Sequence, residues 1–168
     1  VVFKYTKLSK NIAEARAIEV LQASPDRVEP KCKSFELCGG CSLQHMDSSA
    51  QLALKQQTFL GHLEHIGHVS AENLLPPLTG PLWGYRHKAR LGVRYVRKKE
   101  RIMVGFRERG SSFITDTERC EILHQSVGGI VTELAENIAR MEIRERIPQI
   151  EVAVGDNQTV LVFRHLDP

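Results

Sequence analysis

The chain lacks several features that would place it outside the cytoplasm. None of its apolar stretches approaches the length that spans a bilayer. Its first ten residues, 1–10, alternate charged and apolar side chains and contain no apolar signal core. Internal repeats and low-complexity tracts are also missing. We therefore expect a cytoplasmic protein with no membrane partner.

Cysteines are few, and their placement is uneven. Three of the four lie within ten residues, and the fourth is far downstream. Cytoplasmic thiols stay reduced, so we do not expect a disulfide framework of the kind found in small secreted chains. A three-plus-one arrangement favours a four-coordinate metal centre over four ordinary buried thiols. The candidate ligands are Cys32, Cys38, Cys41 and Cys120.

The spacing favours an iron–sulfur cluster over zinc but leaves both open. Zinc sites usually use two short-spaced pairs, and here only Cys38 and Cys41 form such a pair. Three thiolates from one loop and one remote thiolate commonly hold a [4Fe-4S] cluster. We expect Gly39 and Gly40 to adopt positive φ and to bring backbone N–H groups toward sulfur. Three flanking cations are expected to offset an anionic cluster: Lys31, Lys33 and Arg119.

Charge is segregated along a chain whose net charge is only +3. The stretch 83–109 contains ten Lys or Arg and two Glu, a local balance of +8, so the remaining residues sum to −5. Such segregation indicates an anionic partner, most naturally nucleic acid.

One predicted strand, 88–97, carries much of this positive charge on a single face. Because strand side chains alternate, Leu91, Val93 and Tyr95 should face the core while the basic residues face solvent. The cations then lie about 6–7 Å apart, near the phosphate spacing of a single strand. Aromatic residues just before the strand are suited to stacking on unpaired bases. The alternative is a basic strand that only keeps a sheet edge soluble. The expected RNA-binding residues are Trp83, Tyr85, Arg86, His87, Lys88, Arg90 and Arg94.

Hydrophobic periodicity predicts an α+β fold with a mostly antiparallel sheet and two helices. The last two strands are expected to form a hairpin around a Gly-Asp-Asn turn. Strands are predicted at 1–8, 13–21, 88–97, 102–107, 149–154 and 159–164.

The two predicted helices run from about 47 to 66 and from about 124 to 141. In the first, Ser48 and Gln51 resemble a capping box, and Gly67 is the expected stop. Three histidines at its end are interpreted as a polar face rather than a zinc site. The pair Gly128–Gly129 indicates close packing early in the second helix. The apolar stripe of the first helix comprises Leu52, Phe59, Leu63 and Ile66.

Residues around the cysteines carry a resemblance to a known family. The runs SPDRVEPKC at 24–32 and CGGCSLQH at 38–45 are similar to those of the iron–sulfur 23S rRNA (uracil-5-)-methyltransferases. The segment YRHKAR at 85–90 and the context of Cys120 also resemble that family. The five-residue gap between the first two cysteines and the preceding strands resemble the branch with an N-terminal TRAM domain. The related tRNA uracil-5-methyltransferases lack this cluster and fit less well.

The resemblance implies that the four cysteines hold a [4Fe-4S] cluster in an RNA-recognition region. It also implies four parts along the chain. These are the end of an OB-like TRAM β-barrel at 1–22, the cluster loop at 23–45, a helix and linker packing on a catalytic domain at 46–82, and a central RNA-recognition domain at 83–168.

The resemblance further implies that the chain is a fragment of an S-adenosylmethionine-dependent enzyme that forms 5-methyluridine in 23S rRNA. Catalysis in that family uses a further cysteine nucleophile and a Rossmann-like domain. Here every cysteine is assigned to the cluster, and no glycine-rich loop follows a strand. We therefore assign no catalytic or cofactor-binding residue and expect the fragment alone to be inactive, with no stable protein partner. Two alternatives remain: a non-enzymatic zinc-binding RNA module and a redox iron–sulfur protein.

Overall fold

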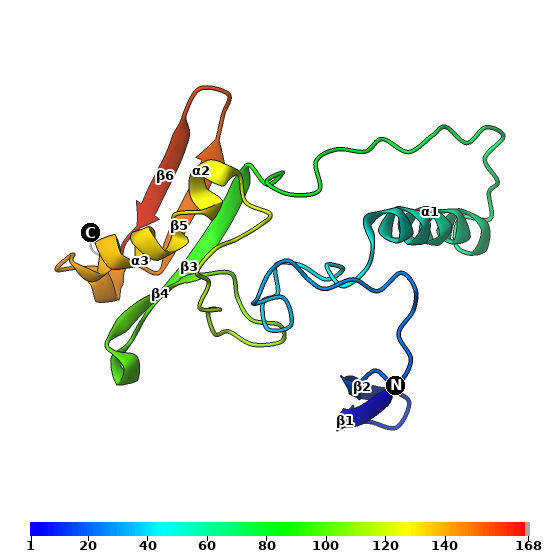
Figure 1. Ribbon diagram of the computed structural model, residues 1–168, viewed down its shortest axis with the longest axis horizontal. Helices are drawn as coiled ribbons and strands as arrows, with labels where there is room; N and C mark the ends of the chain where they lie inside the picture. Colours follow the sequence, from blue (N-terminus) through cyan, green and yellow to red (C-terminus); the bar gives the residue numbers. More distant parts are fainter. Residues whose placement is uncertain (167–168) are drawn as a thin grey trace.

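A four-stranded antiparallel sheet forms the centre of the computed structural model, which describes residues 1–166 (Figure 1). The strands are ordered β4-β3-β5-β6, and each neighbouring pair is antiparallel. The predicted α+β class is therefore confirmed. The last two residues of the predicted 83–168 domain lie outside the described residues. The strands span Lys88–Val96 (β3), Arg101–Gly105 (β4), Gln149–Val154 (β5) and Thr159–Arg164 (β6).

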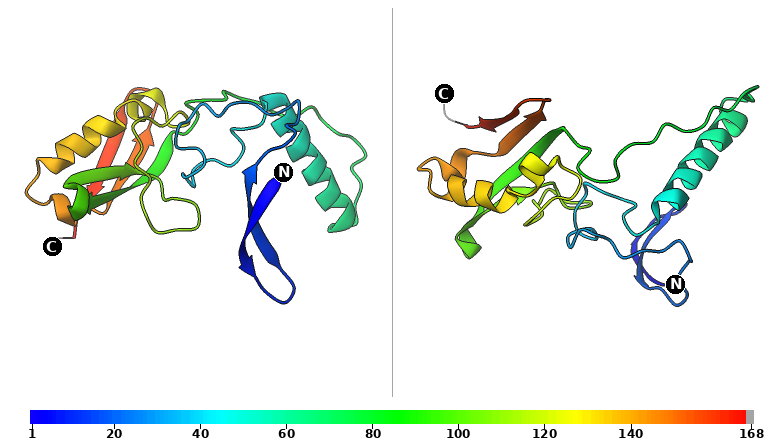
Figure 2. Two further views of the ribbon diagram at one scale, coloured as in Figure 1. Left: turned by 60° about the horizontal axis from the view of Figure 1, so that its bottom comes forward. Right: turned by 45° about the horizontal axis from the view of Figure 1, so that its top comes forward.

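The core lies between one face of this sheet and two helices, α2 (Gln125–Gly128) and α3 (Val131–Ala139), and Figure 2 shows α3 lying across that face. Leu91, Ile138 and Ile150 are at most 1% exposed there. The predicted alternation of β3 is confirmed, because its apolar residues point into this core while its basic residues are exposed. Short 3₁₀ turns follow β3 at Arg97–Lys99 and precede β5 at Arg144–Arg146.

The prediction of one continuous helix at 124–141 is wrong, because the chain breaks between α2 and α3 at Gly129. The preceding Gly128 lies so close to the backbone that a Cβ atom there would stand 2.4 Å from the Cys120 carbonyl oxygen. The expected close packing of the glycine pair is thus confirmed at Gly128. This contact also sets the position of Cys120, whose N–H donates to the Gly128 carbonyl at 2.9 Å.

Two paired glycines let another segment cross the outer face of the sheet. Gly92 on β3 lies opposite Gly105 on β4. A Cβ at Gly92 would stand 2.2 Å from Ile114 Cδ1, and one at Gly105 would stand 2.3 Å from the Thr115 carbonyl oxygen. The segment around Ile114 and Thr115 therefore covers the β3–β4 half of this face. The part formed by β5, β6 and the start of β3 stays open.

The N-terminal residues form a separate hairpin of β1 (Val2–Leu8) and β2 (Ala13–Glu19), which Figure 1 shows apart from the main sheet. All fourteen strand residues are exposed. The second strand ends two residues earlier than predicted. Among the described residues the hairpin pairs with no other strand. Its identification as the end of a TRAM barrel stays a prediction.

Helix α1 (Ser48–His65) stands out from the sheet and has no buried residue. Its predicted capping box is wrong: Asp47 is the N-cap and accepts from the Ser49 N–H at 2.9 Å. Gln51 instead donates from Nε2 to the carbonyls of Leu43 and Met46, at 3.0 and 2.9 Å. The helix ends at His65 with Ile66 as its C-cap, so the predicted stop at Gly67 is confirmed; the left-handed residue that follows is His68, with φ of 52°.

The apolar stripe of α1 faces solvent over much of its length, with Phe59 55% and Ile66 72% exposed. Within the described part of the chain, none of the helices has the length and apolar character needed to cross a membrane.

Candidate metal centre and nucleic-acid interface

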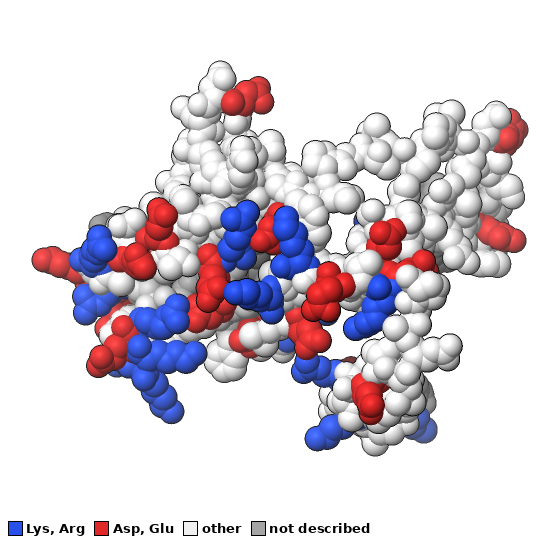
Figure 3. All heavy atoms as spheres, in the orientation of Figure 1, with Lys and Arg blue, Asp and Glu red and all other residues white. Residues whose placement is uncertain are grey.

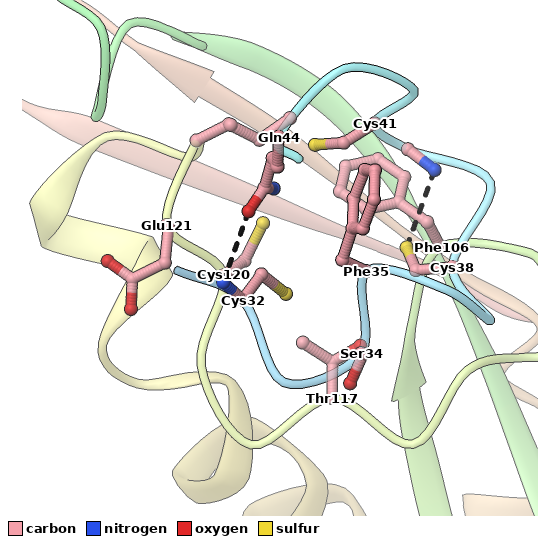
Figure 4. Close-up of a pocket in the computed structure, with 12 residues that line it drawn as sticks. Cys32, Ser34, Phe35, Cys38, Cys41, Gln44, Phe106, Thr117, Cys120 and Glu121 are labelled. Atoms are coloured by element: carbon pink, nitrogen blue, oxygen red, sulfur yellow. Dashed lines mark hydrogen bonds between the residues drawn. The ribbon is translucent and has the colours of Figure 1, made fainter. Parts of the chain in front are cut away.

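The four cysteines meet around one cavity (Figure 4). Cys32, Cys38 and Cys41 come from the loop at 27–45, and Cys120 comes from the segment just before α2. None is in a disulfide. Over residues 1–166, no group of three or more His, Cys, Asp or Glu side chains is arranged to hold a metal ion. The thiols thus share a cavity without converging on one point. The other residues lining it include Phe35, Phe106, Thr117, Glu121 and Ile122.

Backbone hydrogen bonds attach the cysteine loop to the chain that follows β4. The Gly39 N–H donates to the Arg107 carbonyl at 2.8 Å, and the Arg109 N–H donates to the Leu37 carbonyl at 2.9 Å. A Cβ at Gly39 would stand 2.9 Å from that Arg107 oxygen, so this close approach explains the glycine. The predicted positive φ at the glycines of the loop is wrong, because the only glycines with positive φ in residues 1–166 are Gly84 and Gly110.

A single arginine, which the sequence did not single out, also binds this loop. Arg109 Nε donates to the Cys38 carbonyl at 3.2 Å, and its Nη2 donates to the Cys41 carbonyl. The same guanidinium lies 4.9 Å from the centroid of the Phe35 ring. In the sequence, Arg109 stands out only as one of the ten basic residues of the stretch 83–109. The contact joins residues about seventy positions apart, so no local pattern points to it.

Three further contacts order the loop from within. The Gly40 N–H lies 3.4 Å from Cys38 Sγ, so the predicted approach of an N–H group to sulfur is confirmed at this glycine (Figure 4). Gln44 Oε1 accepts from the Cys32 N–H at 3.1 Å. The ring of His45 packs on Phe35 with centroids 5.5 Å apart. Gln44 and His45 therefore support the loop from inside.

The cations that flank the cysteines are paired with carboxylates. Lys31 Nζ and Arg119 Nε lie 3.1 and 2.9 Å from the two oxygens of Glu121. Lys33 Nζ lies 3.8 Å from Glu118. Since Glu121 lines the cysteine cavity, its pairing with two cations leaves a local balance of +1 at the wall of the cavity.

Burial raises the pKa of the Cys32 thiol, and the neighbouring Cys38 and Cys41 raise it further, while a hydrogen bond from the Ser34 backbone lowers it. Burial likewise raises the pKa of Cys120, against backbone hydrogen bonds from residues 122 and 123. Metal ligation requires the thiolate form. A metal group bound by these thiols would therefore release protons as it binds.

The residues predicted to bind RNA divide between two grooves. Trp83 and Tyr85 line a groove of about 890 Å³ between the cysteine loop, the start of α1 and residues 78–85. Arg86, Lys88 and Arg90 line a second groove of about 420 Å³ on the open part of the sheet.

The remaining predicted residues lie elsewhere. The His87 ring packs edge-on against His124 with centroids 5.0 Å apart. Arg94 lines neither groove. Gly92 lies between Arg90 and Arg94 on β3, and Ile114 covers the strand at Gly92. Arg86 stacks on Phe106 at 4.8 Å. Figure 3 shows basic side chains gathered over the β3–β4 end, with acidic side chains between them.

Sequence reasoning missed the contribution of β5 and β6 to the second groove. Val160, Val162 and Glu151 line it beside the predicted cations. Glu151 Oε1 accepts from Arg164 Nε at 3.2 Å and lies 4.0 Å from Arg90 Nε. A carboxylate therefore stands within the basic face and pairs with cations from both neighbouring strands.

No family model matches the chain. It is similar to proteins named 23S rRNA (uracil(1939)-C(5))-methyltransferase RlmD. The protein from Nitrosococcus oceani is 55% identical over 99% of this chain, and that from Methylococcus capsulatus is 49% identical over 99%. The protein from Alcanivorax borkumensis is 48% identical over the whole chain. The chain spans 37–38% of the length of these relatives. The predicted resemblance is confirmed, and the chain is homologous to one part of these proteins.

Proposed function

We propose that this chain is the RNA-recognition and [4Fe-4S]-binding part of an S-adenosylmethionine-dependent methyltransferase that forms 5-methyluridine in 23S rRNA. One observation carries the proposal: Cys120 joins the three loop cysteines around one cavity. It does so in a chain whose relatives are named as 23S rRNA uracil-C5 methyltransferases. The four parts assigned from the resemblance are kept in this proposal.

The spacing of the donor set favours a cluster over a single ion. Zinc sites usually use two short-spaced pairs, and only Cys38 and Cys41 form such a pair here. A [4Fe-4S] cluster, held by Cys32, Cys38, Cys41 and Cys120, would supply a four-point cross-link between the loop and the sheet. We assign it a structural role, because methyl transfer to an activated C5 needs no electron transfer.

The RNA-binding role is supported by the two grooves. One offers exposed aromatic side chains, Trp83 and Tyr85, that suit unpaired bases. The other offers cations beside an apolar floor of Val160 and Val162, which suits a phosphate backbone with bases laid against it. The exposed stripe of α1 is assigned to contact with the rest of the parent enzyme.

Metal analysis with visible absorption tests the centre. The chain, purified without oxygen, is expected to be brown and to contain about four irons. A colourless protein with one zinc would favour the zinc-binding RNA module. Reversible reduction without affinity for RNA would favour the redox protein.

Methyl transfer from labelled S-adenosylmethionine to 23S rRNA tests the enzyme. It is expected with the full-length parent and not with this chain alone. Transfer by the chain alone would contradict the absence of catalytic residues from it. A full-length parent that methylates no uridine would overturn the proposed activity.

A further inference from the structure

The wall between the cysteine cavity and the large groove contains a charged residue with no assigned role. Glu121 lines the cavity, and its side chain is only 12% exposed. Its two oxygens hold Lys31 and Arg119 at 3.1 and 2.9 Å. A carboxylate this enclosed, with two cations on it, is fixed in place far more firmly than an exposed ion pair.

Lys31 also contacts Trp83, which lines the large groove. Its Nζ lies 5.0 Å from the centroid of the Trp83 ring, which lines the groove and keeps 36% exposure. A cation over a tryptophan face attracts the ring electrostatically and restricts its rotation. Glu121, Lys31 and Trp83 thus form one chain of contacts from the cysteines to the groove.

The backbone makes the same connection. The Gly84 N–H, next to Trp83, donates to the Glu121 carbonyl at 2.9 Å, and the Arg86 N–H donates to the Ile122 carbonyl at 2.8 Å. Residues 84–86 are therefore bound to the segment that directly follows Cys120. The cavity and the groove also share lining residues: Gly40, Cys41, Gln44 and Ile122.

We infer that Glu121 is a positioning residue: through Lys31 it holds the Trp83 indole for stacking on an unpaired RNA base, and so couples RNA binding to the cysteine centre. The inference rests on the proposed RNA-binding function. It identifies the ligand of the large groove as a single-stranded segment that presents at least one unstacked base.

The test compares Glu121→Gln with Glu118→Gln in the iron-loaded chain. Glu118 has the same charge, lies two residues before Cys120 and pairs with Lys33, but it contacts neither Lys31 nor Trp83. Trp83 is the only tryptophan, so acrylamide quenching reports on it alone. We expect Glu121→Gln to raise the quenching constant of Trp83 at unchanged iron content, and Glu118→Gln to leave it unchanged. Equal quenching in both variants would overturn the positioning role.

Binding of a short unstructured RNA gives the second measurement. Trp83→Ala is expected to weaken it by about tenfold, because one stacked base is lost. Glu121→Gln is expected to weaken it about two- to fivefold, because Lys31 is no longer held over the Trp83 indole. In the Trp83→Ala background Glu121→Gln should have no further effect. An equal loss in that background would refute the coupling. Absence of RNA binding by the unmutated chain would instead refute the proposed function, while the quenching result would still test the contact.

Discussion

Single side chains from distant parts of the sequence hold the cysteine loop in place. Arg109 binds two carbonyls of that loop and stacks on Phe35. Lysine has one point charge and cannot make this forked contact. We expect Arg109→Lys to release iron to a chelator several-fold faster than the unmutated chain. Arg107→Lys is the matched control, since the hydrogen bond that joins Arg107 to the loop is made by its backbone carbonyl, which the substitution keeps. Equal rates in the two variants would show that the backbone alone holds the loop.

Cys120 connects the loop to the folded core. It packs against the core cluster and is the one cysteine outside the loop. Cys120→Ser is expected to reduce iron well below one cluster per chain and to weaken RNA binding at the same time. Atomic absorption and RNA titration on the same sample measure both. Full iron content in this variant would rule out Cys120 as a ligand.

The cap of α1 provides a pH-dependent test. Hydrogen bonds from the Ser49 hydroxyl and N–H hold the pKa of Asp47 below its ordinary 3.8. A lowered pKa means that the cap stabilises the helix above pH 3.8 and that this contribution is lost as the pH falls through the lowered value. Asp47→Ala should reduce helical circular dichroism at neutral pH, and the difference between the two proteins should shrink as the pH falls below the ordinary value of 3.8 and through the lowered pKa of Asp47. A difference that persists at low pH would contradict the assignment of Asp47 as the cap.

Strands and helices with a clear hydrophobic periodicity were predictable from the sequence. The points where one element ends and the next begins were not. β3 alternates basic and apolar residues, and the structure buries Leu91 and Val93 while Lys88 and Arg90 stay exposed. The break at Gly129 escaped prediction because the glycine pair was interpreted as close packing within one helix; that packing is present at Gly128, against the Cys120 carbonyl.

The segment that covers part of the outer sheet face was also not predicted, because its position depends on a contact between residues far apart in the sequence. Gly92 and Gly105 are ordinary strand residues in the sequence, and only their pairing opens space for Ile114. For the candidate site, the sequence supplied all four cysteines and the aromatic and basic residues. The roles of Arg109 and Glu121 could not be predicted, because their contacts with the cysteine loop and with Lys31 form only in the tertiary fold.

On the open sheet face, Glu151 of β5 reduces the net positive charge beside the proposed RNA-binding cations. It pairs with Arg164 of β6 and lies near Arg90 of β3. Glu151→Gln should free both guanidinium groups, strengthen RNA binding a few-fold and steepen its salt dependence by about 0.7 per added phosphate contact. Asp156→Asn is the control, because it makes the same change of charge in the turn of the same hairpin. An equal effect of the two substitutions would point to net charge rather than to this site.

The molecule as a whole consists of a self-contained core and peripheral parts connected to it mainly through the cysteine region. Core residues such as Leu91, Ile138 and Ile150 pack with one another and not with the cysteine loop. The hairpin and α1 bury none of their own residues. The loop is attached through the chain after β4 and the segment at 120–122. Removing the proposed metal group should therefore affect the molecule unevenly.

Hydrogen exchange with and without an iron chelator measures this difference. A link between Cys41 and Cys120 closes nearly eighty residues, worth on the order of 4 kcal/mol by analogy with a disulfide. Without it, residues 27–46 and 83–87 should lose protection, because their hydrogen bonds depend on the docked loop and on the segment after Cys120. β3, β5 and α3 should keep theirs, since their apolar contacts remain. Uniform loss across the chain would mean that the centre is required for the core itself, and unchanged protection throughout would mean that the cysteines hold no cross-linking group.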